Sequence, residues 1–68
     1  MQLSTRNQLK GKITEIKKGP VSTEVTMDIG GQTMVVASIT TGSADTMELK
    51  VDDTVTALIK ASSVMIMK

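Results

Sequence analysis

The clearest pattern in the chain is a strict alternation of side chains between Val21 and Ile29. Apolar residues and Thr23 recur at every second position, and acidic or hydroxyl-bearing residues lie between them. A period of two over this length predicts a β-strand with one buried face. Gly30-Gly31 follows directly, which predicts a two-residue hairpin turn into the next strand.

A shorter alternation precedes this strand. Leu9, Gly11 and Ile13 alternate with Lys10, Lys12 and Thr14, which predicts a half-buried first strand. Ile16 breaks the parity, so a bulge or the end of the strand is expected near Glu15. The segment Lys17-Lys18-Gly19-Pro20 then predicts a turn, because glycine tolerates a positive φ and proline fixes its own φ.

Two different segments follow the hairpin. Residues 32–40 predict a third strand, and the apolar run Met34-Val35-Val36-Ala37 favours burial of both its faces. Residues 41–49 have few β-branched side chains and predict a short helix capped by Thr41 or Ser43. Three apolar residues of this helix are expected to face the sheet: Ala44, Met47 and Leu49.

The last third of the chain returns to strand patterns. A polar turn at 50–53 leads into a fourth strand at 54–60, a kink at 61–63 and an apolar fifth strand at 64–67. Five strands with one short helix predict an all-β fold, a small five-stranded OB-like barrel. The chain has no internal repeat or low-complexity tract, so residues 1–68 are interpreted as one domain.

Composition makes self-association the expected source of extra stability. A chain of 68 residues buries only about 60% of its unfolded surface. Cys, His and aromatic residues are absent, which excludes disulfides and the commonest metal ligands. Apart from the initiator Met1, the Met residues are interpreted as adaptable packing or subunit contacts rather than metal ligands, namely Met27, Met34, Met47, Met65 and Met67. We therefore expect an oligomer and no metal held directly by protein atoms.

Charge is unevenly distributed along the chain. The net charge of +1 does not by itself argue for nucleic acid. Residues 1–18 carry Arg and Lys with Glu15 as their only acid, whereas residues 19–49 carry no base. A solvated face and a local anion site both explain this split. The chain has no apolar run of about 20 residues and no signal-peptide core. We therefore expect no membrane association, and we expect a cytoplasmic location.

Two segments are rich in hydrogen-bond donors and carry no acid. They are Ser4-Thr5-Arg6-Asn7, with no acid before Glu15, and Lys60-Ala61-Ser62-Ser63, with no acid after Asp53. A tetrahedral dianion has only acceptor oxygens, so its site must consist of N–H groups, hydroxyls and cations. The alternatives are a solvated chain terminus and an ordinary turn before a strand.

These two segments, together with Lys17-Lys18-Gly19 and Ser38-Ile39-Thr40, resemble the molbindins over the whole chain. Molbindins are small molybdate- and tungstate-binding proteins that also occur as TOBE domains of larger proteins. The resemblance implies an oxyanion held at a subunit interface. Carried onto this chain, it assigns Ser4, Arg6 and Asn7 to one subunit and Lys60, Ala61 and Ser62 to another, with Thr40 as a further candidate.

The resemblance also implies a hexamer, built as a trimer of dimers that exchange strands. A second class of oxyanion site is expected around its threefold axis, and the candidates here are Gly19, Val21 and Ser22. Pro20 departs from what such a site needs because it has no N–H to donate. The ligand implied is molybdate or tungstate, with no cofactor.

The expected function is storage, buffering or delivery of this oxyanion. The first alternative is a nucleic-acid-binding OB module, but such modules stack bases on aromatic side chains, which this chain lacks. An enzyme is disfavoured because there is no His, no Cys and no carboxylate pair beside a nucleophile. A detached regulatory domain that reports the oxyanion to a partner protein is a third alternative. We expect neither catalysis nor a nucleic-acid partner.

Overall fold

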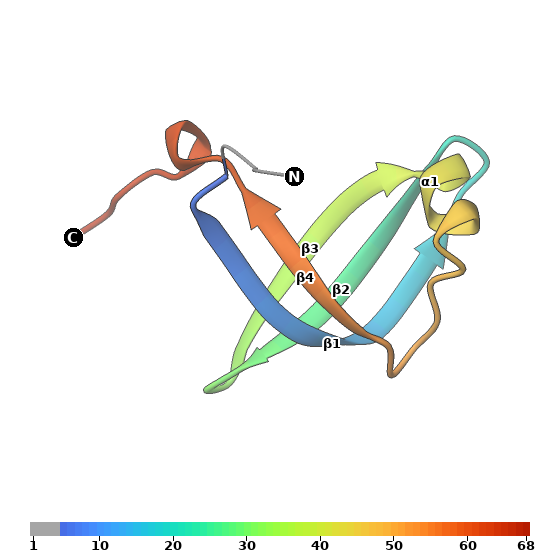
Figure 1. The fold of residues 1–68 in the computed structure, drawn as a ribbon, viewed down its shortest axis with the longest axis horizontal. Coiled ribbons are helices and arrows are strands. Elements are labelled where there is room, and N and C mark those ends of the chain that lie inside the picture. The colour runs from blue at the N-terminus through green and yellow to red at the C-terminus, as the bar shows by residue number, and fades with distance from the viewer. Residues whose placement is uncertain (1–4) are drawn as a thin grey trace.

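The structure, a computed structural model, describes residues 5–68. They form one antiparallel sheet of four strands in the order β3-β2-β1-β4, with one short α-helix and one 3-10 turn (Figure 1). The prediction of a small all-β fold is confirmed. The elements in chain order are β1 Asn7–Lys18, β2 Ser22–Gly30, β3 Thr33–Thr40, α1 Thr41–Thr46, β4 Thr54–Ile59 and η1 Ala61–Ser63.

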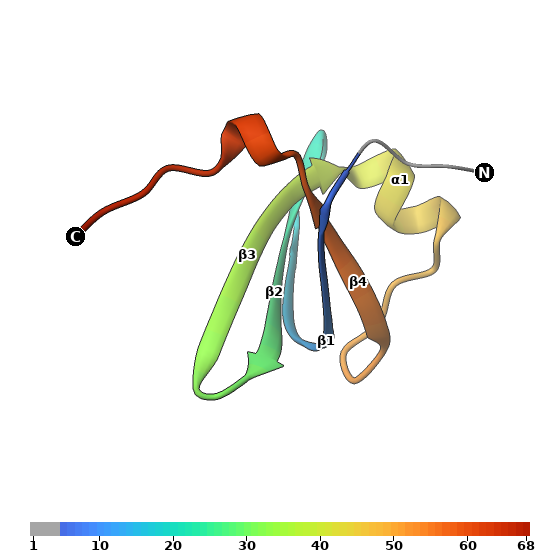
Figure 2. The same ribbon diagram turned by 60° about the vertical axis from the view of Figure 1, so that its left-hand side comes forward.

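The long strand β1 joins the two halves of the sheet. Its residues 7–12 pair with β4 and its residues 12–18 pair with β2. The β1–β2 register shifts between Ile13 and Glu15, which confirms the bulge expected there. A bulge bends its strand and increases the local twist. The sheet therefore curls, and its two edge strands, β3 and β4, lie on either side of one concave face (Figures 1 and 2).

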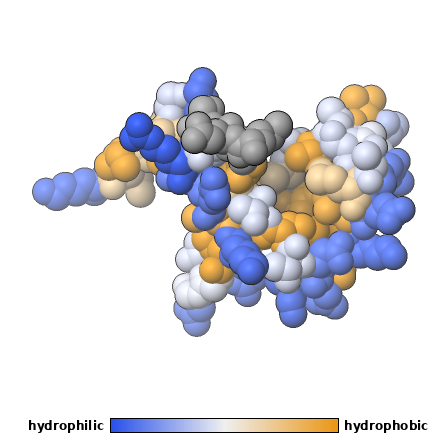
Figure 3. All heavy atoms as spheres, viewed as in Figure 1, coloured by the Kyte–Doolittle hydropathy of each residue, from blue (hydrophilic) through white to orange (hydrophobic). Residues whose placement is uncertain are grey.

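The concave face of the curled sheet carries the apolar core. Ile13, Val25 and Met27 are buried there, and Thr23 is 1% exposed, as the alternation in β2 predicted. The hollow is lined by apolar side chains from every strand, including Ala37 and Ile39 of β3 and Val55 and Ala57 of β4. Figure 3 shows apolar surface gathered in this hollow, between the two edge strands.

Strand β3 differs from the prediction on its outer face. Its inner residues Val35, Ala37 and Ile39 are half-buried, but Met34 is 49% exposed and Val36 is 59% exposed. The prediction that both faces are covered is therefore wrong for the single chain. Its physical reason is that alternate residues of a strand point to opposite faces, and only one face of this single sheet forms the core.

The hairpin between β2 and β3 lies one residue later than predicted. Gly30 still pairs with Thr33, so the two turn residues are Gly31 and Gln32. Their φ angles are 59° and 61°. Positive φ at both central residues is the geometry of a type I′ turn, whose twist matches that of the flanking strands.

The N-cap of helix α1 is Thr40, one residue before the earlier of its two predicted caps. The Oγ1 of Thr40, not a group of Thr41 or Ser43, accepts the N–H of Ser43 at 3.0 Å. Ala44 is buried against the sheet and Leu49 is half-buried, as expected. Met47 is 57% exposed but also lines the apolar hollow of the sheet with Leu49. Both helical segments within residues 5–68 are too short to cross a lipid bilayer.

The predicted fifth strand does not form in the single chain. Residues 64–68 belong to no strand and extend away from the sheet in both ribbon views (Figures 1 and 2). Val64 is 47% exposed, and Met65, Ile66 and Met67 are 93%, 90% and 95% exposed. The prediction of a fifth strand is therefore wrong for the single chain, because an extended apolar segment becomes a strand only when another strand pairs with it.

Candidate functional site

The structure brings the two donor-rich segments together at one end of the sheet. Asn7, the first residue of β1, pairs with Ile59, the last residue of β4. Arg6 directly precedes Asn7 and Lys60 directly follows Ile59, so both segments emerge from the same end of the β1–β4 ladder. We call Arg6, Lys60 and η1 together the cationic end.

The two cations are the next residues beyond the end of this ladder. The pairing runs from Lys12 with Thr54 to Asn7 with Ile59, and Arg6 and Lys60 directly adjoin that last pair. Both side chains are exposed. Like charges that lie near each other repel, and an anion bound beside them relieves that repulsion.

No carboxylate opposes this pair of cations. The residues of β4 that face the first half of β1 are all uncharged, namely Thr54, Val55, Thr56, Ala57, Leu58 and Ile59. The two ion pairs formed within residues 5–68 are Lys17–Glu15 and Lys18–Asp45, so neither Arg6 nor Lys60 is neutralised by an acid there. The acid-free character expected from the sequence therefore holds in three dimensions.

The turn η1 adds short polar groups to the cationic end. It begins after Lys60, whose backbone is extended, and it is closed by the Ser63 N–H donating to the Lys60 carbonyl at 2.8 Å. Ala61, Ser62 and Ser63 are all exposed, and no acid lies in the turn. The first N–H groups of a helical turn have no acceptor within it, so they are available to an external acceptor.

Asn7 is placed differently from the rest of the predicted set. Its Nδ2 donates to the carbonyl oxygen of Ile59 at 3.1 Å, in a half-buried position. Arg6 is exposed, so the two neighbours are not equally accessible. Ser4, the remaining member predicted at the amino end, lies outside the described residues.

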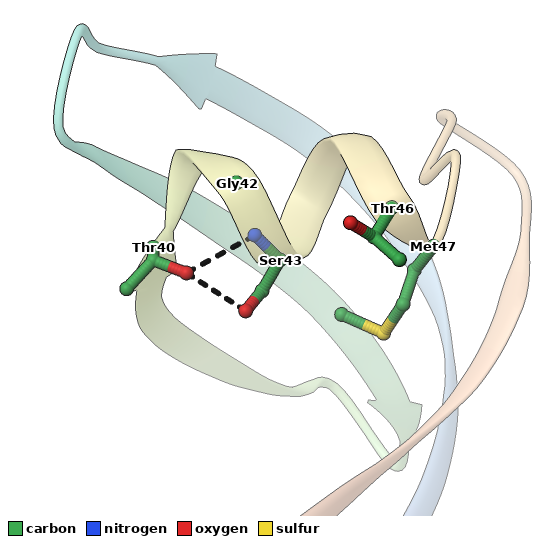
Figure 4. Close-up of a pocket in the computed structure, with 5 residues that line it drawn as sticks. All are labelled: Thr40, Gly42, Ser43, Thr46 and Met47. Carbon is green, nitrogen blue, oxygen red and sulfur yellow. Dashed lines mark hydrogen bonds between the residues drawn. The ribbon is translucent and has the colours of Figure 1, made fainter.

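Thr40 lies at the opposite end of the sheet. Its Oγ1 accepts the Ser43 N–H at 3.0 Å and donates to the Ser43 Oγ at 2.7 Å, so its hydroxyl is used in capping α1 (Figure 4). These residues line an open depression with Gly42, Thr46 and Met47 (Figure 4). Within one chain Thr40 is not brought to Arg6 and Lys60, because it pairs with Ser22 beyond the far end of β1.

The candidates for the second oxyanion site also lie at this far end, which we call the helical end (residues 17–22 and α1). The Gly19 N–H donates to the Ser22 carbonyl at 3.0 Å, and the Val21 carbonyl accepts the Thr41 N–H at 2.9 Å. Val21 is 78% exposed. The Gly19 amide is thus already engaged, and Pro20 has none.

Three residues that were not predicted to belong to a site organise the helical end. The Thr41 Oγ1 donates to the Gly19 carbonyl at 2.6 Å and lies 2.8 Å from the Oγ1 of buried Thr23. Asp45 pairs with Lys18 at 2.8 Å. The sequence offered one signal of this arrangement, Thr23 at a core-facing position of a clear strand, because a buried hydroxyl requires a hydrogen-bond partner.

The chain is similar to known proteins over almost its whole length. Residues 3–66 match the family model of the TOBE domain. Molybdenum-pterin-binding protein 3 of Clostridium pasteurianum is 42% identical over 67 residues, 98% of this chain and 98% of that protein. Molybdenum transport protein ModE of Herbaspirillum seropedicae is 42% identical over 66 residues, but the chain spans only 24% of its length.

A solved structure gives the same result. The molybdate binding protein from Sporomusa ovata matches with a TM-score of 0.95 and 41% sequence identity, covering 100% of both chains. Agreement in sequence and in fold over this length settles the relationship, and the chain belongs to the TOBE domain family.

Proposed function

We propose that this chain binds a tetrahedral oxyanion, molybdate or tungstate, at a subunit interface that includes the cationic end of its sheet. The observation that carries the proposal is the end of the β1–β4 ladder at Asn7 and Ile59, which brings Arg6 and Lys60 to the same end of the sheet with only uncharged residues along the β4 side of the ladder. The relatives support the choice of ligand, because their names describe molybdate binding, molybdenum-pterin binding and molybdenum transport. The role we propose is binding rather than catalysis.

The donors at this end suit a fully deprotonated oxyanion. The guanidinium of Arg6 supplies charge and several directed N–H groups, two of which can bind two oxygens of the oxyanion at once. Lys60 supplies a second charge, and Ala61 and Ser62 supply backbone N–H groups and a hydroxyl. Ser4, predicted from the sequence, is proposed as a further hydroxyl donor. Charge-assisted bonds of this kind contribute about 1.5–3 kcal/mol each.

The biological role that we propose is storage, buffering or delivery of the oxyanion inside the cell. Residues 1–68 would act as one binding domain. The stand-alone Clostridium protein, covered to 98%, is consistent with such a role. The match to a quarter of ModE indicates that the same domain also occurs inside a longer transport-related protein.

We further propose that copies of the chain exchange their apolar tails to assemble. Val64-Met65-Ile66-Met67 is apolar on both faces of an extended strand and is exposed in the single chain. The hollow between the edge strands β3 and β4 is apolar inside, and exposed apolar residues flank it outside: Met34, Val36 and Leu58. A strand that is apolar on both faces fits between edges of that composition. The hexamer implied by the molbindin resemblance remains our proposal for the final state.

Assembly is tested by the mass of the protein in solution. Ile66→Asp places a charge on the tail and should convert the oligomer to a monomer by light scattering, since a buried unpaired charge is strongly unfavourable. Lys68→Asp, two residues further on, is the matched control and should leave the mass unchanged. A parent protein that is a folded monomer both with and without molybdate would contradict the proposal.

Binding is tested by isothermal titration with molybdate, tungstate, sulfate and phosphate. We expect molybdate and tungstate to bind with similar stoichiometry and phosphate, which is partly protonated at neutral pH, to bind more weakly. The stoichiometry also tests the further candidates at the helical end, namely Thr40 and the proposed second site at Gly19, Val21 and Ser22. Absence of heat with all four anions would reject the proposed function.

A further inference from the structure

We propose that Asn7 acts on the oxyanion indirectly, by aiming the backbone N–H of Lys60, rather than as a direct ligand. The inference rests on the proposed function and deepens it. It assigns to Asn7 a role different from the one its place in the Ser-x-Arg-Asn motif predicts. Three features of the structure carry it.

The first feature is the hydrogen bond that Asn7 already makes. Its Nδ2 donates to the Ile59 carbonyl at 3.1 Å, across 52 residues of sequence. Within residues 5–68 this is the only side-chain hydrogen bond that reaches any residue after Asp53. The amide of Asn7 therefore fastens the start of β1 to the residue directly before Lys60.

The second feature is the direction of the side chain. Asn7 continues the core-facing series of β1 formed by Leu9, Gly11 and Ile13, and like Leu9 and Gly11 it is half-buried. Arg6 is exposed, as are Gln8 and Lys10. Because successive side chains of an extended chain point to opposite faces, Asn7 and Arg6 do not converge on one anion from the same side.

The third feature is the geometry of the peptide that Asn7 holds. The Ile59 carbonyl and the Lys60 N–H belong to one planar unit, and the chain has no cis peptide bond among its described residues. In a trans peptide these two groups point in opposite directions. Together with the backbone pairing of Asn7 with Ile59, fixing the carbonyl toward Asn7 turns the Lys60 N–H away from β1, to the open edge of β4, where a ligand can reach it. A bonded carbonyl also polarises its peptide, which strengthens that N–H as a donor.

The chemistry of the amide agrees with this assignment. A direct role would have to use the Asn7 Nδ2, and this group already donates to the Ile59 carbonyl. That donation satisfies a half-buried polar group within the chain. Asn7 is accordingly a positioning residue of the cationic end.

The experiment compares variants of the full chain by nuclear magnetic resonance without ligand and by molybdate titration. Asn7→Ala should shift the Lys60 amide resonance, speed amide exchange at the end of the β1–β4 ladder and weaken molybdate binding roughly three- to tenfold. Asn7→Leu has nearly the same shape and keeps the core-facing position filled, so it should give the same result. It serves as the test variant if Asn7→Ala folds poorly.

Two further variants separate positioning from direct contact. Arg6→Ala should weaken molybdate binding while leaving the ligand-free Lys60 resonance in place. Gln8→Ala, on the neighbouring exposed position, should change neither quantity. Weaker binding in both Asn7 variants with an unchanged ligand-free Lys60 resonance would make Asn7 a direct ligand and overturn the inference, as would unchanged binding. A parent protein that does not bind molybdate would instead reject the proposed function, and the inference with it.

Discussion

The two ends of β1 carry similar residues and use them in opposite ways. At the cationic end Arg6 and Lys60 lie against uncharged neighbours, and the polar groups of η1 are exposed. At the helical end Lys18 is paired with Asp45 at 2.8 Å, and the Gly19 amide is bonded to Ser22 at 3.0 Å. Sequence composition describes both ends as basic and rich in donors. Among the described residues, the donors of Lys18 and Gly19 at the helical end are engaged within the chain.

This contrast shows that availability, rather than the number of donors, distinguishes a binding end from a structural one. The hydroxyl of Thr41 bonds to Gly19 and contacts buried Thr23, so the polar groups of the helical end hold a loop against a helix. A donor used in this way would have to break an internal bond before it could bind an anion. The loss of one bond would offset the gain of the other.

The largest expected effect comes from adding an acid to the cationic end. Ser62→Asp places a carboxylate near the oxyanion, and repulsion of about 4 kcal/mol between unit charges 4 Å apart near a protein surface predicts a loss of affinity of roughly a hundred- to a thousandfold. The measurement is molybdate titration. Thr46→Asp makes the same change at the helical end and should leave affinity within about twofold; equal losses in both variants would erase the distinction between the ends.

Removal of a cation should have the next largest effect. Arg6→Ala loses a charge-assisted contact of about 1.5–3 kcal/mol, so molybdate affinity should fall roughly ten- to a hundredfold. Lys17→Ala is the comparison at the other end, where the lysine lies exposed and 3.8 Å from Glu15. Its effect should stay below about threefold. The reverse order would place the main site at the Lys17–Gly19 turn.

A change at the helical end should lower stability rather than binding. Thr41→Val removes the hydroxyl that bonds to Gly19 and leaves that of Thr23 without its partner, at a cost of about 1–3 kcal/mol in the free energy of unfolding. For a domain of this size the melting temperature should fall by roughly 5–20 °C. Thr46→Val is the control, and its melting temperature should hardly change. Thermal unfolding and molybdate titration of the same samples check both parts.

The smallest expected effect is that of breaking the ion pair at the helical end. Lys18 and Asp45 have side chains that are 60% and 57% exposed, so Asp45→Asn should change the free energy of unfolding by less than about 1 kcal/mol. The number of molybdate ions bound per chain should stay the same, because the Gly19 amide remains bonded to Ser22. An additional bound ion in this variant would show that Asp45 masks a second site.

Much of the fold was predictable because it depends on local alternation. Strand β2 has one face made of Thr23, Val25 and Met27, and these residues are buried as predicted. The parity break at Ile16 located the bulge in β1. The hairpin was displaced by one residue because Gln32, which no local rule favours at φ 61°, shares the turn with Gly31. The tail looked like a strand from its pattern, but pattern does not say whether the partner strand is in the same chain.

The site was predictable in its chemistry and less so in its geometry. Absence of acids around Arg6 and Lys60 is a property of the sequence, and the fold preserves it. The roles of Asn7, Thr40 and Gly19 could not be predicted from the sequence, because each has a donor that forms a hydrogen bond within the folded chain. Which hydrogen bonds a side chain makes depends on contacts with residues remote in sequence.

The pairing of Asn7 with Ile59 also determines when the cationic end can exist. These residues are separated by 52 positions, so everything between them must be synthesised before their ladder can close. The β2–β3 hairpin, in contrast, joins neighbouring segments and can pair while later residues are still being added. The cationic end is therefore a non-local feature of the fold, which requires both end segments of the sheet to be present at once.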